Sequence, residues 1–229
     1  MSTREEIVYS LIAQECEAAS RRRWPSIGHI SLKRLFDLAG GIVLALVFLP
    51  IFLPYCIAVR LSGKPVFFGQ MRIGRNGRPF RCYKFRTMVV NADAVLEDLL
   101  ERDAEARREW ASCHKLRDDP RITPVGRWLR RTSLDELPQI WNVIKGEMSL
   151  VGPRPVVYEE VPRYGRRARH YLSVQPGMTG LWQVSGRNDT GYRRRVAMDV
   201  WYVRNQSLGL DCLILLKTVS VVISARGAY

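Results

Sequence analysis

The sequence has few of the residues that mark common classes of enzyme. Its five cysteines are widely spread and form no CxxC pair, so neither a zinc ribbon nor a disulfide framework is indicated, and a reducing compartment fits. Its three histidines form no HExxH motif. The chain also lacks a Walker phosphate loop, a GxGxxG motif and a GxSxG motif. It therefore carries none of the short signatures of zinc metalloproteases, P-loop enzymes, dinucleotide-binding enzymes or serine hydrolases.

Acidic residues are scarce as well. The 229 residues include 22 Asp and Glu against 36 Lys and Arg, which gives a net charge of +14. Such a chain is expected to bind anionic partners, such as nucleic acid, anionic lipid or a phosphorylated substrate. Hydrophobic residues make up 47% of the chain, so it can bury a core, and its length fits one domain or two small ones.

One long stretch has no charge at all. The 22 residues Leu38–Val59 would form a helix about 33 Å long, and the core of a bilayer is about 30 Å thick. The stretch begins too late for a signal peptide, and it is apolar on every side, which fits a soluble core helix poorly. This pattern predicts a helix embedded in a membrane.

Two geometries are open for this helix. Pro50 and Pro54 interrupt the backbone ladder, so a bend after Leu49 would leave two legs, Leu38–Leu49 and Ile51–Val59, each too short to cross a bilayer. A re-entrant helical hairpin therefore competes with a kinked helix that spans the membrane.

The charges on both sides of the apolar stretch favour the hairpin. Lys and Arg lie on both flanks, and no acidic residue occurs between Asp37 and Asp93. Basic flanks prefer the cytoplasmic side, so re-entry satisfies both, whereas a single crossing satisfies only one. These flanks are also expected to attract anionic membrane lipids.

The rest of the sequence predicts a mainly helical α+β fold. We expect an N-terminal extension over residues 1–30, the re-entrant membrane helix over 31–62, and a cytoplasmic domain over 63–229 that continues from it. Turn residues and patterning predict a β-hairpin, a third strand and several helices, the last of them apolar and interfacial or buried. The strands are Pro65–Ile73, Pro79–Met88, joined at Asn76-Gly77, and Met178–Val184; the helices are 92–112, Val125–Arg131, Leu134–Lys145, Tyr192–Arg204 and Asp211–Ser224.

Adjacent carboxylates, Asp135 and Glu136, are the main candidates for chemistry. One explanation is structural, because Ser133 through Glu136 matches a capping box that opens a helix. That explanation does not account for the arginines crowded just before the pair, nor for the Pro-Arg-Pro turn at Pro153–Pro155. A carboxylate at a helix N-terminus among arginines lies beside an anion site, which suits a nucleophile that attacks phosphorus.

At this point the sequence resembles a family, the monotopic phosphoglycosyl transferases, which are bacterial sugar transferases. The resemblance runs from Ser31 to Tyr229 and departs from the family at the bend, where Leu49-Pro50 replaces Ser-Pro. It rests on blocks in the family's order, which are KRLFD (Lys33–Asp37), YKFRTM (Tyr83–Met88), SLDELPQIWNVIKGEMSLVGPRP (Ser133–Pro155), QPGMTGLWQVSGRN (Gln175–Asn188) and DVWYV (Asp199–Val203).

The resemblance implies a two-step transfer in exopolysaccharide synthesis. Asp135, matching the family nucleophile, would attack the β-phosphorus of a UDP-sugar and release UMP. Undecaprenyl phosphate would then take the sugar phosphate, with galactose or glucose as the sugar. Mg²⁺ held by Asp135 and Glu136 would screen the diphosphate from the nucleophile. Glu136 would serve as a metal ligand or polarise the acceptor phosphate, and a capping role stays open for it.

The same resemblance and the residue chemistry suggest which side chains bind substrate. Arg154, held between Pro153 and Pro155, and Arg130 match phosphate-binding positions of the family. The remaining candidates are Lys84, Arg86, Thr87, Arg187 and Asn188, with Trp182 and Gln183 as weaker ones.

A non-enzymatic reading is the alternative. A basic, membrane-attached module that binds lipid or nucleic acid would explain the charge and the apolar stretch. It would not explain the acidic pair or the Pro-Arg-Pro turn, and no nucleic-acid-binding motif is recognised. We therefore expect an enzyme on the cytoplasmic face of the bacterial inner membrane, with no nucleic-acid partner.

Overall fold

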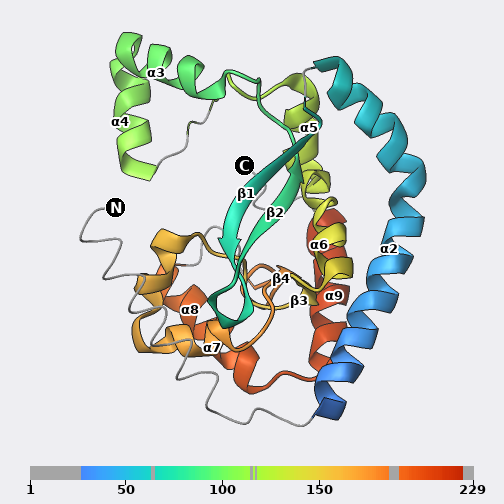
Figure 1. Cartoon of the computed structure of the whole chain (residues 1–229). Helices are drawn as coiled ribbons and strands as arrows, with labels where there is room; N and C mark the ends of the chain where they lie inside the picture. The colour runs from blue at the N-terminus through green and yellow to red at the C-terminus, as the bar shows by residue number, and fades with distance from the viewer. Residues whose placement is uncertain (1–26, 63–64, 114–115, 117, 186–190, 224–229) are drawn as a thin grey trace.

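The structure is a computed structural model that describes residues 27–62, 65–113, 116, 118–185 and 191–223. It is mostly helical, with two small sheets of two strands each in the described part (Figure 1). This confirms the predicted mainly helical α+β class. In chain order, the helices and strands are α2 (Ile27–Ser62), β1 (Phe67–Ile73), η1 (Arg75–Gly77), β2 (Pro79–Phe85), α3 (Ala92–Arg102), α4 (Ala104–Cys113), α5 (Pro124–Thr132), η2 (Leu134–Glu136), α6 (Gln139–Lys145), β3 (Ser149–Val151), η3 (Tyr158–Arg167), α7 (Ala168–Leu172), β4 (Gly177–Thr179), α8 (Tyr192–Arg204) and α9 (Leu208–Ile223).

Helix α2 is one continuous helix of 36 residues, with Pro50 and Pro54 inside it. It curves along one side of the molecule (Figure 1). The two legs predicted from the prolines are therefore joined, and the re-entrant hairpin is not confirmed. The segment Leu32–Leu61 is long and apolar enough to cross a membrane, with a mean hydropathy of 2.7. It is the one such helix among the residues that the structure describes.

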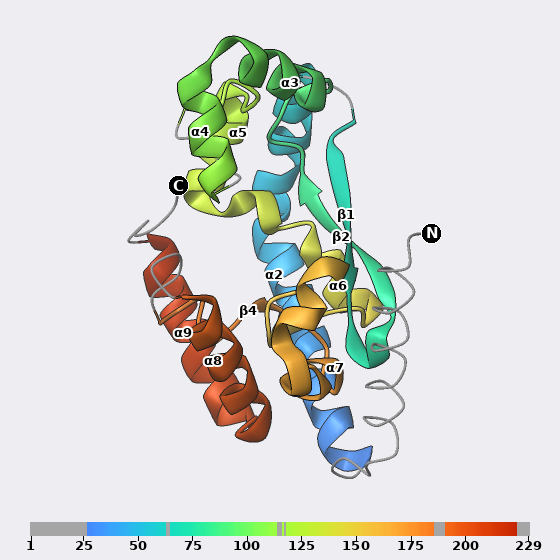
Figure 2. The ribbon, with the colours of Figure 1, turned by 90° about the vertical axis from the view of Figure 1, so that its left-hand side faces the viewer.

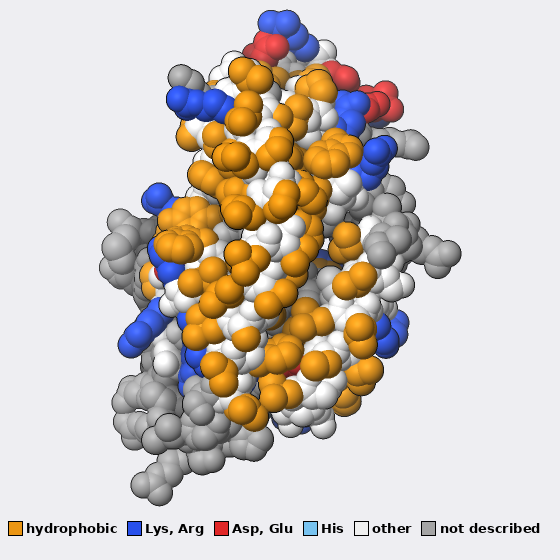
Figure 3. Space-filling view, turned by 90° about the vertical axis from the view of Figure 1, so that its right-hand side faces the viewer, with side chains coloured by type: hydrophobic (Ala, Val, Ile, Leu, Met, Phe, Trp, Pro, Cys, Tyr) orange, Lys and Arg blue, Asp and Glu red, His pale blue; other side chains and the backbone are white. Residues whose placement is uncertain are grey.

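The outer surface of α2 is apolar. Hydrophobic side chains gather over this face of the molecule (Figure 3). Leu46, Val47 and Leu53 are more than half exposed, as are Leu213 and Leu216 of α9. Exposed apolar area of this extent marks a surface that contacts a membrane or another protein.

The β-hairpin of β1 and β2 confirms the prediction from Asn76-Gly77. The strands pair antiparallel from Phe67 opposite Phe85 to Ile73 opposite Pro79. Asn76 has a φ of 57°, the left-handed conformation that Asn and Gly tolerate at hairpin turns.

The single helix predicted at 92–112 is two helices, and this part of the prediction was wrong. Helix α3 ends at Asp103, whose backbone is extended. Its carboxylate oxygen Oδ1 then accepts hydrogen bonds from the backbone N–H groups of Glu105 and Ala106, at 2.8 and 3.1 Å. Asp103 thus begins α4 as its N-cap. The two helices lie at the end of the molecule opposite α7 and α8 (Figures 1 and 2).

The predicted strand Met178–Val184 is much shorter in the structure. Only Gly177–Thr179 forms a strand, β4, which pairs parallel with β3. The backbone of β4 comes so close that a Cβ at Gly152 would lie 2.8 Å from the backbone nitrogen of Gly177. A glycine is therefore required where the Pro-Arg-Pro turn leaves β3.

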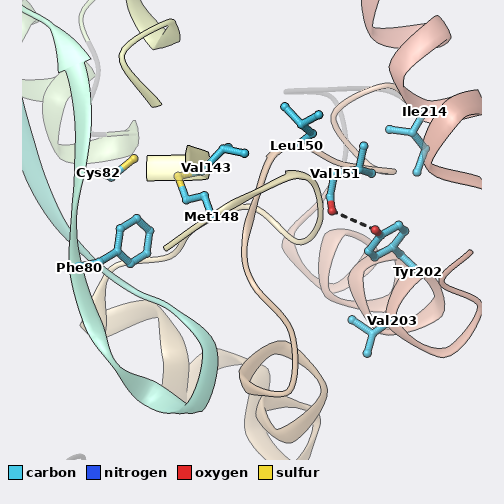
Figure 4. Packing of buried hydrophobic residues seen from close by; sticks show 9 residues of the cluster. All are labelled: Phe80, Cys82, Val143, Met148, Leu150, Val151, Tyr202, Val203 and Ile214. Atoms are coloured by element: carbon cyan, nitrogen blue, oxygen red, sulfur yellow. Dashed lines mark hydrogen bonds between the residues drawn. The ribbon is translucent and has the colours of Figure 1, made fainter. Parts of the chain in front are cut away.

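The largest buried cluster joins the strands to the C-terminal helices. It is contributed by β2, α6, β3, α8 and α9 and the segment between α6 and β3 (Figure 4). Its buried members are Phe80, Cys82, Val143, Met148, Leu150, Val151, Tyr202, Val203 and Ile214.

Buried polar groups attach α2 to this core. Lys33 lies 3.2 Å from Asp37 and 2.9 Å from Asp211 of α9. Asp37 also accepts hydrogen bonds from the Ser149 hydroxyl and the Leu150 N–H of β3, at 2.9 and 3.0 Å. The KRLFD block therefore fixes the membrane-type helix against the strand that leads into the Pro-Arg-Pro turn.

Candidate active site

The local backbone around Asp135 differs from a capping box. Thr123 caps the preceding helix α5, because its hydroxyl accepts a hydrogen bond from Gly126 N–H at 2.9 Å. Ser133 ends α5 in a left-handed conformation with a φ of 57° and makes no side-chain cap bond. The capping-box explanation was therefore wrong, and Asp135 and Glu136 lie on a short 3₁₀ turn, η2, between α5 and α6.

A cavity of about 670 Å³ opens beside this turn. Seven of the residues predicted from sequence line it, together with Trp182 and Gln183. They come from the end of β2, from α5 and η2, and from the turn after β3. The seven are Lys84, Arg86, Thr87, Arg130, Asp135, Glu136 and Arg154.

Asp135 is the unusual carboxylate of this cavity. Its burial, reinforced by the negative charge of Glu136, raises its pKa to about 6, although Lys84 and Arg130 oppose the rise. It forms no ion pair with any described residue. A carboxylate of this kind remains mainly ionised at neutral pH and is more basic than an ordinary aspartate.

Glu136 has the opposite environment. Its carboxylate Oε1 lies 2.6 Å from the Lys84 ammonium nitrogen. Burial works against its ionisation, but Lys84, Arg154 and Arg72 together outweigh burial and hold its pKa below the usual range. The two neighbouring carboxylates are therefore pushed apart in pKa, a pattern that separates roles in acid, base and nucleophilic sites.

Arg130 is held at the cavity by Thr87. Its Nε donates a hydrogen bond to the Thr87 hydroxyl at 2.9 Å. Gly126 packs on the same strand end, since a Cβ there would lie 2.0 Å from the Thr87 carbonyl oxygen. This close approach fixes α5, and with it Arg130, against the end of β2.

The Pro-Arg-Pro turn buries its two prolines and exposes the arginine between them. Pro153 and Pro155 are buried, whereas Arg154 is exposed and lies 5.9 Å from the centre of the Trp182 ring. Arg72 of β1 donates to the Pro155 carbonyl oxygen at 3.2 Å. The Tyr171 hydroxyl accepts from Val156 N–H at 3.1 Å, so the backbone beyond the turn is also fixed.

Comparison with known proteins identifies the family of this chain. The family model described as bacterial sugar transferase matches residues 28–225. The chain belongs to the bacterial sugar transferase family. It is 52% identical over 198 residues to the UDP-galactose-lipid carrier transferase of Erwinia amylovora, and 52% identical over 198 residues to the undecaprenyl-phosphate galactose phosphotransferase of Salmonella typhimurium. In each case the match covers 86% of this chain and 42% of the relative.

A shorter relative matches along nearly its whole length. The chain is 50% identical over 204 residues to the exopolysaccharide production protein ExoY of Sinorhizobium fredii, with 89% of this chain and 90% of the relative covered. Compared with the two longer relatives, the chain spans about two fifths of their length. The non-enzymatic alternative is not supported, because the relatives from Erwinia amylovora and Salmonella typhimurium are named as transferases.

Sequence analysis of this sugar transferase missed two residues that shape the site. Asn142 is fully buried; its side chain accepts from Tyr83 N–H at 3.1 Å and donates to the Arg81 carbonyl at 2.8 Å. It ties α6 to the strand that carries Lys84. Arg72 was noted only as part of a basic flank, yet it acts on Glu136. Neither residue stands in a pattern that local spacing distinguishes.

The remaining predicted residues are two substrate-binding candidates and the three residues of the membrane bend. Arg187 and Asn188 lie outside the described residues. Leu49, Pro50 and Pro54 are exposed on α2. Within the described part of the chain, no group of three or more His, Cys, Asp or Glu side chains gathers to hold a metal ion. The carboxylates that line the cavity are Asp135 and Glu136 on η2 and Asp93 on α3.

Proposed function

We propose that the protein transfers a sugar 1-phosphate from a UDP-sugar to undecaprenyl phosphate, with release of UMP, as a membrane step of exopolysaccharide synthesis. The names of the relatives support a UDP-sugar donor and a lipid carrier as acceptor. Galactose, which two of those names contain, is the preferred sugar, and glucose is the alternative. The proposal depends on one observation: Asp135, a carboxylate with a raised pKa, lines a cavity together with cationic side chains such as Lys84 and Arg130.

Asp135 is the proposed nucleophile. One of its carboxylate oxygens attacks the β-phosphorus of the donor, and the bond from this phosphorus to the oxygen that bridges to the α-phosphorus breaks. UMP leaves with that oxygen, and Asp135 carries the sugar phosphate as an acyl phosphate. A carboxylate with a raised pKa is a better nucleophile than an ordinary one, while still mainly ionised at pH 7.

The second half of the reaction returns Asp135 to its starting state. An oxygen of the lipid phosphate attacks the same phosphorus, and the bond between phosphorus and the Asp135 oxygen breaks. The product is a lipid diphosphosugar. One phosphoric anhydride is exchanged for another at each step, so neither step needs an outside source of energy.

The cations of the cavity have a positioning role in this proposal. Phosphoryl transfer depends mainly on alignment and on neutralisation of charge. Arg154 projects from a rigid turn, and Arg130 is held by Thr87, so each is prepared to fork onto a phosphate group. Lys84 keeps Glu136 ionised beside them.

The two carboxylates fit a magnesium ion in chemistry and number. Mg²⁺ prefers oxygen ligands and is usually held by one or two carboxylates together with substrate phosphates. Asp135 and Glu136 would hold it, with one oxygen of Glu136 already bound by Lys84. When bound, the ion would neutralise the diphosphate and lower its repulsion of Asp135. We expect EDTA to abolish release of UMP and Mg²⁺ to restore it; full activity in EDTA would contradict this assignment.

The apolar surface suggests how the acceptor arrives. The cavity wall includes Thr218, Val221 and Val222 of α9, and α9 also exposes Leu213 and Leu216. A lipid phosphate whose chain stays in the bilayer would enter from this side. We place the protein on the cytoplasmic face of the inner membrane, with anionic lipids meeting its basic flanks.

The re-entrant topology is part of the proposal and is tested by accessibility. In a background without native cysteines, Leu32→Cys and Leu61→Cys would label the two ends of the apolar segment. We expect an impermeant thiol reagent to modify both from the cytoplasmic side only. Modification from opposite sides would identify a spanning helix instead.

The covalent step is tested with donor alone. Protein incubated with UDP-galactose labelled in the sugar, without lipid phosphate, should release UMP and gain one sugar phosphate on the peptide that contains Asp135. The full-length protein in detergent or nanodiscs is used for both measurements. Ping-pong kinetics should accompany the adduct.

Two variants make this test decisive. Asp135→Asn should neither gain the label nor turn over, and Glu136→Gln should turn over slowly but retain the ability to be labelled. Label that persists in Asp135→Asn would identify another nucleophile. A wild-type protein that releases UMP only when both substrates are present would instead indicate direct attack by the lipid phosphate.

A further inference from the structure

The arginine of the Pro-Arg-Pro turn is held differently from the other cations of the cavity. Lys84 is paired with Glu136 at 2.6 Å, and Arg130 donates through Nε to a neighbouring hydroxyl group. Among the described residues, the Arg154 guanidinium forms no ion pair. Its carbon lies 5.9 Å from the centre of the Trp182 ring, and an aromatic face attracts a guanidinium within about 6 Å. An aromatic ring therefore takes the place that a carboxylate has beside Lys84.

The backbone brings this ring to the arginine. Strand β3 leads into the Pro-Arg-Pro turn, and the segment after β4 carries Trp182. Gly152 N–H donates to the Thr179 carbonyl oxygen at 2.9 Å. Gly177 N–H donates to the Pro153 carbonyl oxygen at 2.8 Å. The two backbone segments that carry the guanidinium and the ring are thus bonded directly to each other.

The ring itself has little freedom to move. Trp182 is only 4% exposed, yet it lines the cavity together with Arg154. The guanidinium carbon of Arg195, on α8, lies 4.6 Å from the centre of the same ring. A ring fixed in this way presents a stationary electron-rich face. It can therefore limit the rotamers of an exposed arginine, whose side chain otherwise loses much conformational entropy when it binds.

A ring positions an arginine without using the groups that bind phosphate. A carboxylate partner would occupy N–H donors of the guanidinium and offset its charge. The ring attracts the cation through its quadrupole and leaves the charge and the N–H donors available. Arg154 is thus restricted in position but still able to fork onto a phosphate group.

We propose that Trp182 is a positioning residue that holds Arg154 in the orientation in which it forks onto a phosphate of the donor. The inference rests on the proposed function, in which Arg154 binds the diphosphate of a UDP-sugar. Trp182 was predicted from sequence only as a weak candidate for substrate contact. Here it acts through Arg154, because a prepositioned guanidinium loses less conformational entropy when the donor binds.

Loss of the aromatic face should impair use of the donor. For a cation–π pair with an exposed cation, we expect kcat/KM for UDP-galactose to fall about two- to fivefold in Trp182→Leu. Trp182→Phe keeps an aromatic face and should retain most of the wild-type value. Both variants remove volume from a buried site, so both should lower the melting temperature. The melting temperature therefore reports the packing, and the difference in kcat/KM between the two variants reports the aromatic face.

A double-mutant cycle with Arg154→Ala separates action through Arg154 from any other effect. Release of UMP is measured on the full-length protein in nanodiscs, with fixed undecaprenyl phosphate and varied UDP-galactose. If the ring acts through the arginine, Trp182→Leu should cause no further fall in kcat/KM once Arg154 is replaced by alanine. The melting temperature should fall in both backgrounds.

A change that keeps the shape of the ring provides a second test. Site-specific replacement of Trp182 with fluorinated tryptophans withdraws electron density from the ring face and leaves its packing almost unchanged. We expect kcat/KM for UDP-galactose to fall progressively with fluorine content, and to be insensitive to it in the Arg154→Ala background. This test holds even where Trp182→Leu does not fold.

Trp141→Leu is the matched control. The Trp141 ring of α6 also lies near a cation, with its centre 5.7 Å from the Lys145 ammonium nitrogen. It is more than half exposed and does not line the cavity. Its loss should leave kcat/KM for UDP-galactose unchanged.

Several results would overturn the inference. Equal losses of kcat/KM in Trp182→Leu with and without Arg154 would show that the ring acts on the substrate or through the fold. Equal losses in Trp182→Phe and Trp182→Leu, or no trend with fluorine content, would remove the role of the aromatic face. Absence of UMP release by the wild type with both UDP-galactose and UDP-glucose would overturn the proposed function, and this inference with it. An active wild type without coupling between Trp182 and Arg154 overturns this inference alone.

Discussion

Removal of the Lys84 charge should move the pH dependence of the first half-reaction. Lys84 lies 2.6 Å from Glu136 and also lowers the pKa of Asp135. In Lys84→Met the side chain stays unbranched and only one atom shorter, but it loses its charge. The pKa of Asp135, already raised to about 6 by burial and Glu136, should therefore rise further.

The size of the effect follows from the ionised fraction of Asp135. With a pKa of about 6, roughly nine tenths of the carboxylate is ionised at pH 7. A rise of about one pKa unit would leave about half of it ionised at that pH. Only the ionised form attacks phosphorus, so the rate at pH 7 should fall about twofold from this cause alone and recover toward about pH 8.5.

The assay is the burst of UMP with donor alone, measured from about pH 5.5 to about pH 9 at fixed Mg²⁺. Lys145→Met is the matched control, since Lys145 of α6 lies over the rings of Tyr83 and Trp141, at 5.8 and 5.7 Å, and not beside the carboxylates. The acid limb of the pH–rate profile should move to higher pH in Lys84→Met only. An acid limb that does not move, or that moves to lower pH, would refute the electrostatic reasoning. A lower burst rate that persists at high pH would instead indicate that Lys84 contacts a phosphate group of the donor.

Three further changes test the site and its support. Asp135→Asn should raise the stability of the protein at pH 7 and leave it unchanged below about pH 4. The reason is that the folded state raises the pKa of Asp135, so the wild-type protein loses stability as the pH rises from the unfolded pKa to the folded pKa of this carboxyl group. Equal melting temperatures of the two proteins at pH 7 would contradict the raised pKa. Gly126→Ala should lower the free energy of unfolding by about 1–3 kcal/mol or more in chemical denaturation, since the new Cβ would lie 2.0 Å from the Thr87 carbonyl oxygen. The control Gly209→Ala, whose Cβ would have nothing within 4 Å, should leave the free energy of unfolding unchanged or raise it. Equal effects of the two substitutions would contradict this reasoning. Arg154→Lys keeps the charge but loses the fork, so kcat/KM should fall by an amount equal to about 1–3 kcal/mol; near-normal values in Arg154→Ala would make the residue a surface charge.

Local patterns predicted the elements that depend on neighbouring residues alone. The hairpin follows from Asn76-Gly77, and α8 occupies the predicted range Tyr192–Arg204. The break between α3 and α4 depends on a single side chain, Asp103, which caps the second helix. Propensity summed over 92–112 does not detect such a break, because every residue around Asp103 favours a helix.

The capping box failed for a related reason. Its pattern occurs in the sequence, but Ser133 is already needed to end α5 in a left-handed conformation. One residue does not serve both as the end of one helix and as the side-chain cap of the next. The spacing of residues 133 to 136 is the same whether Ser133 ends one helix or caps the next, so the sequence alone does not distinguish these two roles.

The sequence did not predict the contacts that hold the candidate residues in place. Seven of the residues taken from the family resemblance and from charge line one cavity. Their placement, however, depends on contacts between distant segments, such as Asn142 to β2 and Asp37 to β3. Polar residues of this kind look like surface residues in a sequence, because only the fold brings their partners to them.

Asp135 differs from the other buried acidic residues of this basic chain. Within the described chain, the buried carboxylates Asp37, Asp119, Asp199 and Asp211 each have a donor from a fixed partner. Asp199 has only the neutral Tyr164 phenol, so burial raises its pKa to about 7, but it lies away from the cavity. Asp135 combines a raised pKa with an open cavity and with no ion pair among the described residues, while its neighbour Glu136 takes the nearby lysine. A basic chain that ties its other buried acids to fixed donors thus leaves Asp135 without such a donor, as the nucleophilic role that we propose for it requires.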